Sequence, residues 1–236
     1  MPSTTRCSAI THTGRVRSNN EDAIAVSAVC KDPLARWSGS LSPSTGWALV
    51  ADGMGGHAAG EVASRLAVEF LRTVIEKLQT ESEVASAINA VNQALYCAMD
   101  QHPELSGFGT TIAGICLRGD HALIFNVGDS RIYISWRGVL RQLSHDDAVA
   151  GYLLTQCLGG VNKPTNLSPH FLRVSWPRGA SFLLCSDGLT DMVPDDHIQQ
   201  ILDERIDNPA DALIAAALEK GGVDNVSAIV IGSRDR

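Results

Sequence analysis

Hydrophobic residues recur every three or four positions in three long segments of the chain. From Glu61 to Leu78 they fall on one face of a helix, and the same holds from about Glu83 to Met99. A third helix is expected to begin at Asn208, which can cap it, with Pro209 in its first turn, and to end near Gly221. The pattern therefore predicts three long helices.

Shorter apolar or alternating runs of strand length lie between and around these helices. The tetrapeptides RGDH and WRGV are expected to be turns between neighbouring strands, and WSGSLSPSTG is expected to be a loop. Many antiparallel strands with a few long helices indicate an α+β sandwich, in which sheets pack together under helices. The runs are DAIAVSAV, GWALVA, TTIAGICL, HALIFNVG, RIYISW, SFLLCS and NVSAIVIG.

Composition narrows the possible environments and partners. The formal net charge of -7 argues against nucleic-acid binding, which usually needs a basic surface. No apolar run approaches the length that spans a bilayer, and the start of the chain lacks the order of a signal peptide. The 6 cysteines show neither C-x-x-C pairing nor zinc-like spacing. We therefore expect a cytoplasmic protein that binds neither membranes nor nucleic acid.

Acidic residues stand where the expected strands begin or end. One such Asp-Gly pair by itself would usually be a turn, but a recurrence at so many strand ends is poorly explained by independent turns. Carboxylates brought together repel one another unless a cation lies among them, and an all-oxygen set favours Mg²⁺ or Mn²⁺. The aspartates at strand ends are Asp22, Asp52, Asp129, Asp187 and Asp224, and Glu21 precedes the first of them.

These motifs resemble the bacterial PP2C-type (PPM family) metal-dependent protein serine/threonine phosphatases. The resemblance extends over almost the whole chain and keeps the family's order. It implies a single phosphatase domain over residues 1–236, built as a four-layer αββα sandwich with two antiparallel sheets packed face to face between helices. The motifs are GRVRSNNED (Gly14–Asp22), VADGMGGHAAGE (Val50–Glu61), GFGTTIAG (Gly107–Gly114), NVGDSRIYI (Asn126–Ile134), LLCSDGLTDMV (Leu183–Val193) and GGVDNVSAIVI (Gly221–Ile231).

The resemblance also implies a ligand set for two Mn²⁺ or Mg²⁺ ions and a third, weaker site. Asp52 matches the ligand that bridges the two ions, and the carbonyl of Gly53 matches a ligand of the second. The remaining carboxylates of the first ion match Asp187 and Asp224. Glu21 and Asp22 match ligands of the second ion, partly through water, and Asp129 with Asp187 matches the third site.

The implied reaction is hydrolysis of phosphoserine and phosphothreonine by a water or hydroxide that bridges the two ions. Arg17 matches the arginine that grips the substrate phosphate, for which its planar donors are suited. The leaving alkoxide needs a proton, and His57 in the glycine loop is the natural general acid, although a single histidine is more often structural. No cysteine nucleophile is required, so Cys185 is expected to lie in the core.

Two features depart from the bacterial pattern. Asp147 and Ala148 stand where the family commonly has a His-Ser pair, and only AGYLL separates this point from TQCLGG, where the family usually has a long flap. We therefore expect a more open site, with substrate selection transferred to loops such as Val161–Ser168.

The leading hypothesis is an active phosphatase that acts on phosphorylated proteins, including a cognate Ser/Thr kinase and its substrates, and that is a monomer. The alternative is a catalytically weak PP2C-like module that binds and regulates a partner. A third possibility is an unrelated two-metal hydrolase of small phosphoesters, which would need a defined ligand pocket.

Overall fold

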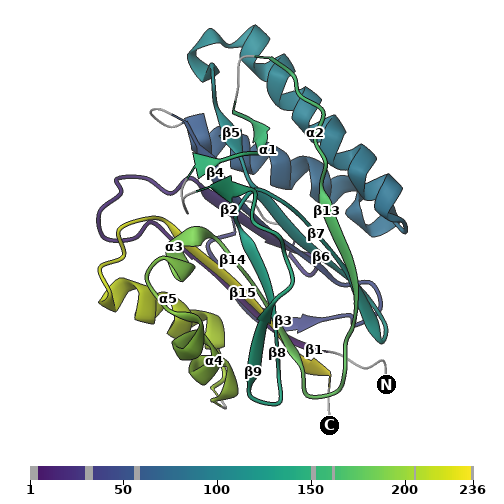
Figure 1. The fold of residues 1–236 in the computed structure, drawn as a ribbon, viewed down its shortest axis with the longest axis vertical. Coiled ribbons are helices and arrows are strands. Elements are labelled where there is room, and N and C mark those ends of the chain that lie inside the picture. Colours follow the sequence, from purple (N-terminus) through teal and green to yellow (C-terminus); the bar gives the residue numbers. More distant parts are fainter. Residues whose placement is uncertain are drawn as a thin grey trace.

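The computed structural model describes residues 5–29, 34–55, 59–149, 153–160, 163–204 and 206–234. It has four layers, with two antiparallel sheets in the middle and helices on both outer faces (Figure 1). The α+β sandwich expected from the sequence is therefore confirmed. Among the described residues, no helix is long and apolar enough to cross a membrane.

The two sheets are built from strands that are far apart in the sequence. One sheet has the order β3 (Arg36–Leu41), β1 (Thr5–His12), β15 (Val226–Arg234), β14 (Ser181–Cys185), β8 (Arg131–Trp136) and β9 (Val139–Gln142). The other has the order β12 (Leu158–Gly159), β5 (Gly109–Thr110), β4 (Trp47–Met54), β6 (Ile112–Arg118), β7 (His121–Val127) and β13 (His170–Ser175), with β2 (Asp22–Val26) also paired to β4. A small hairpin joins β10 (Ala148–Val149) to β11 (Leu153–Leu154).

Helices cover the outer face of each sheet. Figure 1 shows the pair α1 and α2 over the sheet that contains β4, and α4 and α5 on the opposite side of the molecule. A capping box formed by Thr80 and Glu83 begins α2. The helices are α1 (Ala59–Val74), α2 (Glu81–Gln101), α3 (Asp187–Thr190), α4 (Asp195–Asp203) and α5 (Pro209–Glu219), with 3₁₀ turns at Ile75–Lys77 and Pro103–Leu105.

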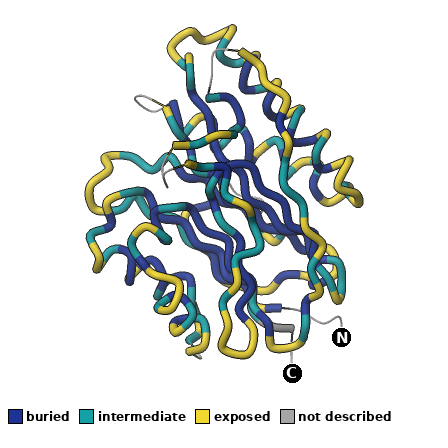
Figure 2. The backbone as a smooth tube through the Cα atoms, viewed as in Figure 1, coloured by how far each residue is buried: buried dark blue, intermediate teal, exposed yellow. Residues whose placement is uncertain are grey.

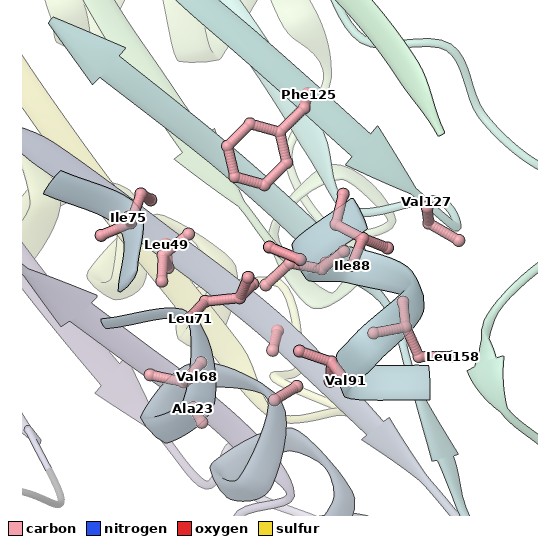
Figure 3. Close-up of a cluster of buried hydrophobic side chains, with 14 of the residues drawn as sticks. Ala23, Leu49, Val68, Leu71, Ile75, Ile88, Val91, Phe125, Val127 and Leu158 are labelled. Atoms are coloured by element: carbon pink, nitrogen blue, oxygen red, sulfur yellow. The ribbon is translucent and has the colours of Figure 1, made fainter. Parts of the chain in front are cut away.

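Strand β4 shows why its sequence, WALVA, is apolar throughout. Leu49 and Ala51 pack in the cluster beneath α1 and α2, whereas Ala48 and Val50 pack in the cluster between the two sheets. Successive side chains of a strand point to opposite faces, so a strand covered on both faces must be hydrophobic at every position. Figure 2 shows that the backbone of both sheets is buried over much of its length. Figure 3 shows helix side chains such as Leu71 and Ile88 near Leu49 and Phe125.

Two expectations about local structure need correction, and one helix was not predicted. Part of the predicted loop WSGSLSPSTG is strand β3, which pairs with β1 at a sheet edge; it is mostly exposed, so it carries no apolar pattern. Asn208 stands at the start of α5 but makes no side-chain capping hydrogen bond. The short amphipathic helix α4, with sequence DDHIQQILD, was not predicted; it buries only Ile198 and Ile201.

Candidate active site

The acidic residues from the two sheets meet at a single cavity of about 510 Å³ at one end of the sandwich. The cavity lies near the ends of β2 and β4 and the start of α3, which Figure 1 shows close together. Its walls contain Arg17, Asn19, Glu21, Asp52, Gly53, Met54, Gly55, Thr111, Asp129, Leu153, Leu154, Cys157, Gly160, Asp187, Asp224 and Asn225.

The backbone of Asp52 is held by two threonine hydroxyl groups. Its N–H donates to Thr111 Oγ1 at 2.9 Å, and its carbonyl accepts from Thr110 Oγ1 at 2.9 Å. Because β4 continues to Met54, Asp52 lies within the strand and not at its end. Its carboxylate is therefore fixed by strand geometry, which is more rigid than a loop.

The other sheet supplies Asp187 and Asp224. Asp187 is the first residue of α3, directly after β14, and Asp224 immediately precedes Asn225 and β15. The Asn225 side chain accepts from the N–H of Glu21 at 2.8 Å and donates to the carbonyl of Asn19 at 2.8 Å. This amide therefore ties the segment that carries Glu21 to the strand that follows Asp224.

Asp22 is set back from the cavity, opposite Asp52 in the register of β2 and β4. Its Oδ2 accepts from the hydroxyls of Ser186 at 2.8 Å and Ser227 at 2.6 Å. Its Oδ1 is buried and has no hydrogen-bond partner. An unpaired buried carboxylate oxygen is costly unless water or a cation satisfies it, so this atom suits a site whose ligands act partly through water.

Arg17 faces the cavity in an ion pair. Its Nη2 lies 2.7 Å from Asp224 Oδ2, and this hydrogen bond, followed by the charge of Asp224, raises the pKa of the Arg17 guanidinium. The side chain of Arg17 is 57% exposed, which leaves donors of its guanidinium accessible to a ligand. The structure therefore places the positively charged side chain of Arg17 on the same cavity as all the predicted metal ligands except Asp22.

Burial and repulsion between neighbouring carboxylates raise the pKa values of several acids at the site. Burial, with a smaller contribution from the charge of Asp187, raises the pKa of Asp22 to about 7 and that of Asp129 to about 6. Burial also raises the pKa of Asp52, with added repulsion from Asp22 and Asp187. Carboxylates in this state are stabilised by protons or by a divalent cation, so the cluster fits a metal site.

Gly53 stands where no side chain fits. A Cβ at this position would collide with the backbone carbonyl oxygens of Gly60 and Glu21. The chain thus passes very close to the start of α1, while Gly53 itself lines the cavity. This close approach explains the glycine and agrees with a backbone carbonyl that faces a ligand.

Not every predicted site residue can be placed. His57 lies outside the described residues, as do the first two positions of the segment 161–168. The described remainder of that segment is attached to α2, where Asn92 Nδ2 donates to the Thr165 carbonyl at 2.9 Å. Its role in substrate selection stays a prediction. Cys185 is fully buried, as expected for a core residue.

Several cavity and supporting residues were missed by sequence reasoning. Thr111 and Asn225 lie inside the motifs GFGTTIAG and GGVDNVSAIVI, so the signal was present, although no chemistry was assigned to them. Ser186 and Ser227 touch the site only through Asp22, and a pairing of this kind between strands is not visible in a sequence. Leu153 and Leu154 enter the wall through the short hairpin β10–β11.

Comparison with known proteins agrees with this fold and cavity. The family model "Protein phosphatase 2C" matches residues 21–220. The serine/threonine phosphatase stp of Listeria innocua is 31% identical over 94% of this chain and 93% of its own length. The catalytic domain of PstP, solved in complex with two manganese ions, superposes with a TM-score of 0.82 at 30% identity, covering 99% of this chain and 100% of that one. PppA of Pseudomonas aeruginosa gives a TM-score of 0.81 at 28% identity, with 97% of each chain covered.

A face-to-face pair of antiparallel sheets with an acidic, arginine-containing cavity at its end defines a metal-dependent protein phosphatase. This chain belongs to the protein phosphatase 2C family.

Proposed function

We propose that this chain, a protein serine/threonine phosphatase, hydrolyses phosphoserine and phosphothreonine in proteins with two divalent cations held in the acidic cavity. The observation that carries the proposal is the convergence of Asp52, Asp187 and Asp224 from two sheets on one cavity that also contains Arg17. The manganese ions of the solved PstP domain support the choice of Mn²⁺ or Mg²⁺.

The ligand assignment follows the placement of the acids. Asp52 would be shared by both ions, with Asp187 and Asp224 on the first and the carbonyl of Gly53 on the second. Glu21 and Asp22 would complete the second ion, Asp22 through water because it is set back. Asp129 and Asp187, whose charges interact, would hold a third, weaker ion. When bound, the ions neutralise phosphate charge and lower the pKa of the attacking water.

The chain's own residues bind the phosphate and supply the proton. Arg17 donates hydrogen bonds to phosphate oxygens. Its Nη2 pairs with Asp224, and an Asp224 carboxylate that held an ion would compete less with the substrate for this guanidinium. His57 donates a proton to the leaving serine or threonine oxygen.

The test is hydrolysis of a phosphoserine peptide by the purified chain with Mn²⁺, with and without chelator. We expect activity that chelator removes, and loss of activity in Asp52→Ala and Asp187→Ala. Asp207→Ala is the matched control, because Asp207 is exposed, lies 3.5 Å from Arg6 in a surface ion pair, and is not among the described residues that line the cavity. Full turnover by Asp52→Ala would exclude the proposed chemistry, and peptide binding without any turnover would favour a regulatory binding module.

The physiological setting is also part of the proposal. We propose that the chain reverses a cognate Ser/Thr kinase, acts as a monomer and works in the cytoplasm, where its five described cysteines stay free. Phosphoproteomics of a deletion strain tests the kinase relation, and light scattering of the purified chain tests the oligomeric state.

A further inference from the structure

A second group of metal-ligand side chains lies outside the acidic cavity. His145 and Asp147 come from the loop after β9, and His170 begins β13. Each offers one ligand atom, and these atoms all lie within 4.8 Å of one another. The rings of His145 and His170 are stacked, with centroids 4.5 Å apart. None of the three residues lines the acidic cavity.

We propose that His145, Asp147 and His170 form a binding site for Zn²⁺ or a similar first-row divalent metal ion, separate from the proposed catalytic ions. Two imidazoles and one carboxylate are the mixed nitrogen and oxygen set that Zn²⁺ takes, with a fourth position left for water. In the acidic cavity, by contrast, all the predicted ligands that the structure describes would coordinate an ion through oxygen. The two sites therefore differ in the class of ion they prefer.

The distances allow such an ion with small movements. In a tetrahedral zinc site with bonds of about 2.0–2.1 Å, neighbouring ligand atoms lie about 3.4 Å apart. His170 Nε2 and Asp147 Oδ1 are 2.8 Å apart, so they need to separate by about half an ångström. His145 is exposed and its ring already stacks on that of His170, so a small rotation of the ring would bring its ligand atom closer.

Surrounding hydrogen bonds already orient the proposed ligands. Asp147 Oδ2 accepts from the Gly128 N–H at 3.0 Å and from Gln156 Nε2 at 2.9 Å, which leaves Oδ1 directed at His170. The Asn126 amide holds the backbone of His145 from both sides, with bonds of 2.7 Å and 3.2 Å. Outer contacts of this kind fix metal ligands in proteins and raise affinity.

An entry path is also present. A cavity of about 220 Å³ opens beside the site and is lined by Asn126, His145 and His170 together with apolar residues. Asp147 itself is buried, so a bound ion would have a carboxylate on its inner side and open space on its outer side. This arrangement satisfies the ligand, orientation and access requirements of a metal site.

The test is direct binding of Co²⁺ and Zn²⁺ to the full chain, read by visible absorption and by metal content after dialysis. We expect one ion in a tetrahedral environment, whose absorption persists in Asp52→Ala, where the catalytic site is disabled. His145→Ala and His170→Ala should each weaken binding by about 100-fold or more, and Gln156→Ala by about 10-fold. Zn²⁺ should displace Co²⁺ from this site.

His121→Ala is the matched control, because His121 also contacts a carboxylate, Asp120 at 3.0 Å, but has no second histidine beside it among the described residues. Since His145 is exposed, its replacement should leave the fold intact, which circular dichroism checks. The proposal is overturned if no tetrahedral ion binds, if the signal survives His145→Ala, or if it disappears with Asp52→Ala. These outcomes are independent of whether the catalytic cavity hydrolyses phosphopeptides.

Discussion

At the scale of single residues, Arg17 pairs with Asp224, and its proposed role adds the substrate phosphate as a competing anionic partner. Replacement by lysine keeps the charge but removes the planar, multiply donating group. We expect Arg17→Lys to lower kcat/KM for a phosphopeptide by about 10- to 100-fold, mainly through KM, since a charge-assisted hydrogen bond contributes about 1.5–3 kcal/mol. Steady-state kinetics measure the change.

Arg15→Lys is the control for this experiment, because Arg15 Nε donates to the Leu218 carbonyl at 3.0 Å and does not line the cavity. Equal effects of the two substitutions on KM would contradict the assigned role of Arg17.

The proposed proton donor, His57, can be tested separately from the proposed metal ligands. His57→Ala should slow hydrolysis of a phosphoserine peptide by about 100- to 10,000-fold in kcat. Hydrolysis of p-nitrophenyl phosphate should fall much less, because nitrophenolate leaves without a proton. A similar loss with both substrates would show that His57 does not act as the general acid.

The sequence located the acids well and their supporting residues poorly. Asp52 and Asp187 could be assigned to one site because each follows an apolar run, a pattern that is local in the chain. Ser186 and Ser227 could not be assigned to this site from the sequence. Their hydroxyl groups donate hydrogen bonds to Asp22 only because distant strands have paired. Contacts made between distant segments leave no periodic signal.

At the scale of elements, the short hairpin β10–β11 contributes apolar side chains to the cavity wall. Leu153 lines the cavity yet remains 61% exposed, so it is available to a protein substrate. We expect Leu153→Ala to raise KM for a phosphopeptide several-fold, because apolar contact with residues beside the phosphoserine is lost. Turnover of p-nitrophenyl phosphate should change much less, since this small substrate has no peptide residues beside its phosphate.

Val139→Ala, at an equally exposed position of 63% on β9, is the control. An effect of Leu153→Ala on both substrates would indicate damage to the metal centre and would contradict a role in substrate recognition.

Elements with strong periodicity were predicted, whereas the interior strand β1, with sequence TRCSAITH, and the edge strand β3 were not. Helices α1 and α2 and the buried strands such as β4 bury whole faces, which makes their patterns regular. Strand β3 has only one paired neighbour and a largely exposed surface, so polar and small residues are tolerated there and resemble a loop. Elements that bury a whole face could therefore be predicted from the sequence more reliably than elements without a regular hydrophobic pattern.

At the scale of the whole molecule, the acidic cavity couples stability to cations and pH. In chelator, Asp22 with a pKa of about 7 and Asp129 with a pKa of about 6 bind more protons in the folded state than in the unfolded state. The free energy of unfolding should therefore fall as pH rises from about 4 to about 7. Thermal unfolding in chelator at pH 5 and pH 8 measures this, and Mn²⁺ should raise Tm at pH 8.

A chelated chain that becomes more stable across the same pH interval would contradict the raised pKa values. An unchanged Tm on addition of Mn²⁺ at pH 8 would contradict binding of the cation to the folded cavity.

Strand β15 lies in the interior of its sheet, between β1 near the beginning of the chain and β14. The carboxylate of Asp224 stands at its entrance, while Asp22 and Asp52 belong to segments made much earlier. The ribosome must therefore release β15 before this sheet can close and before all the proposed ligands of the first ion are present in the folded chain. If Asp224 is a ligand as proposed, the chain should therefore be inactive until translation has passed this segment.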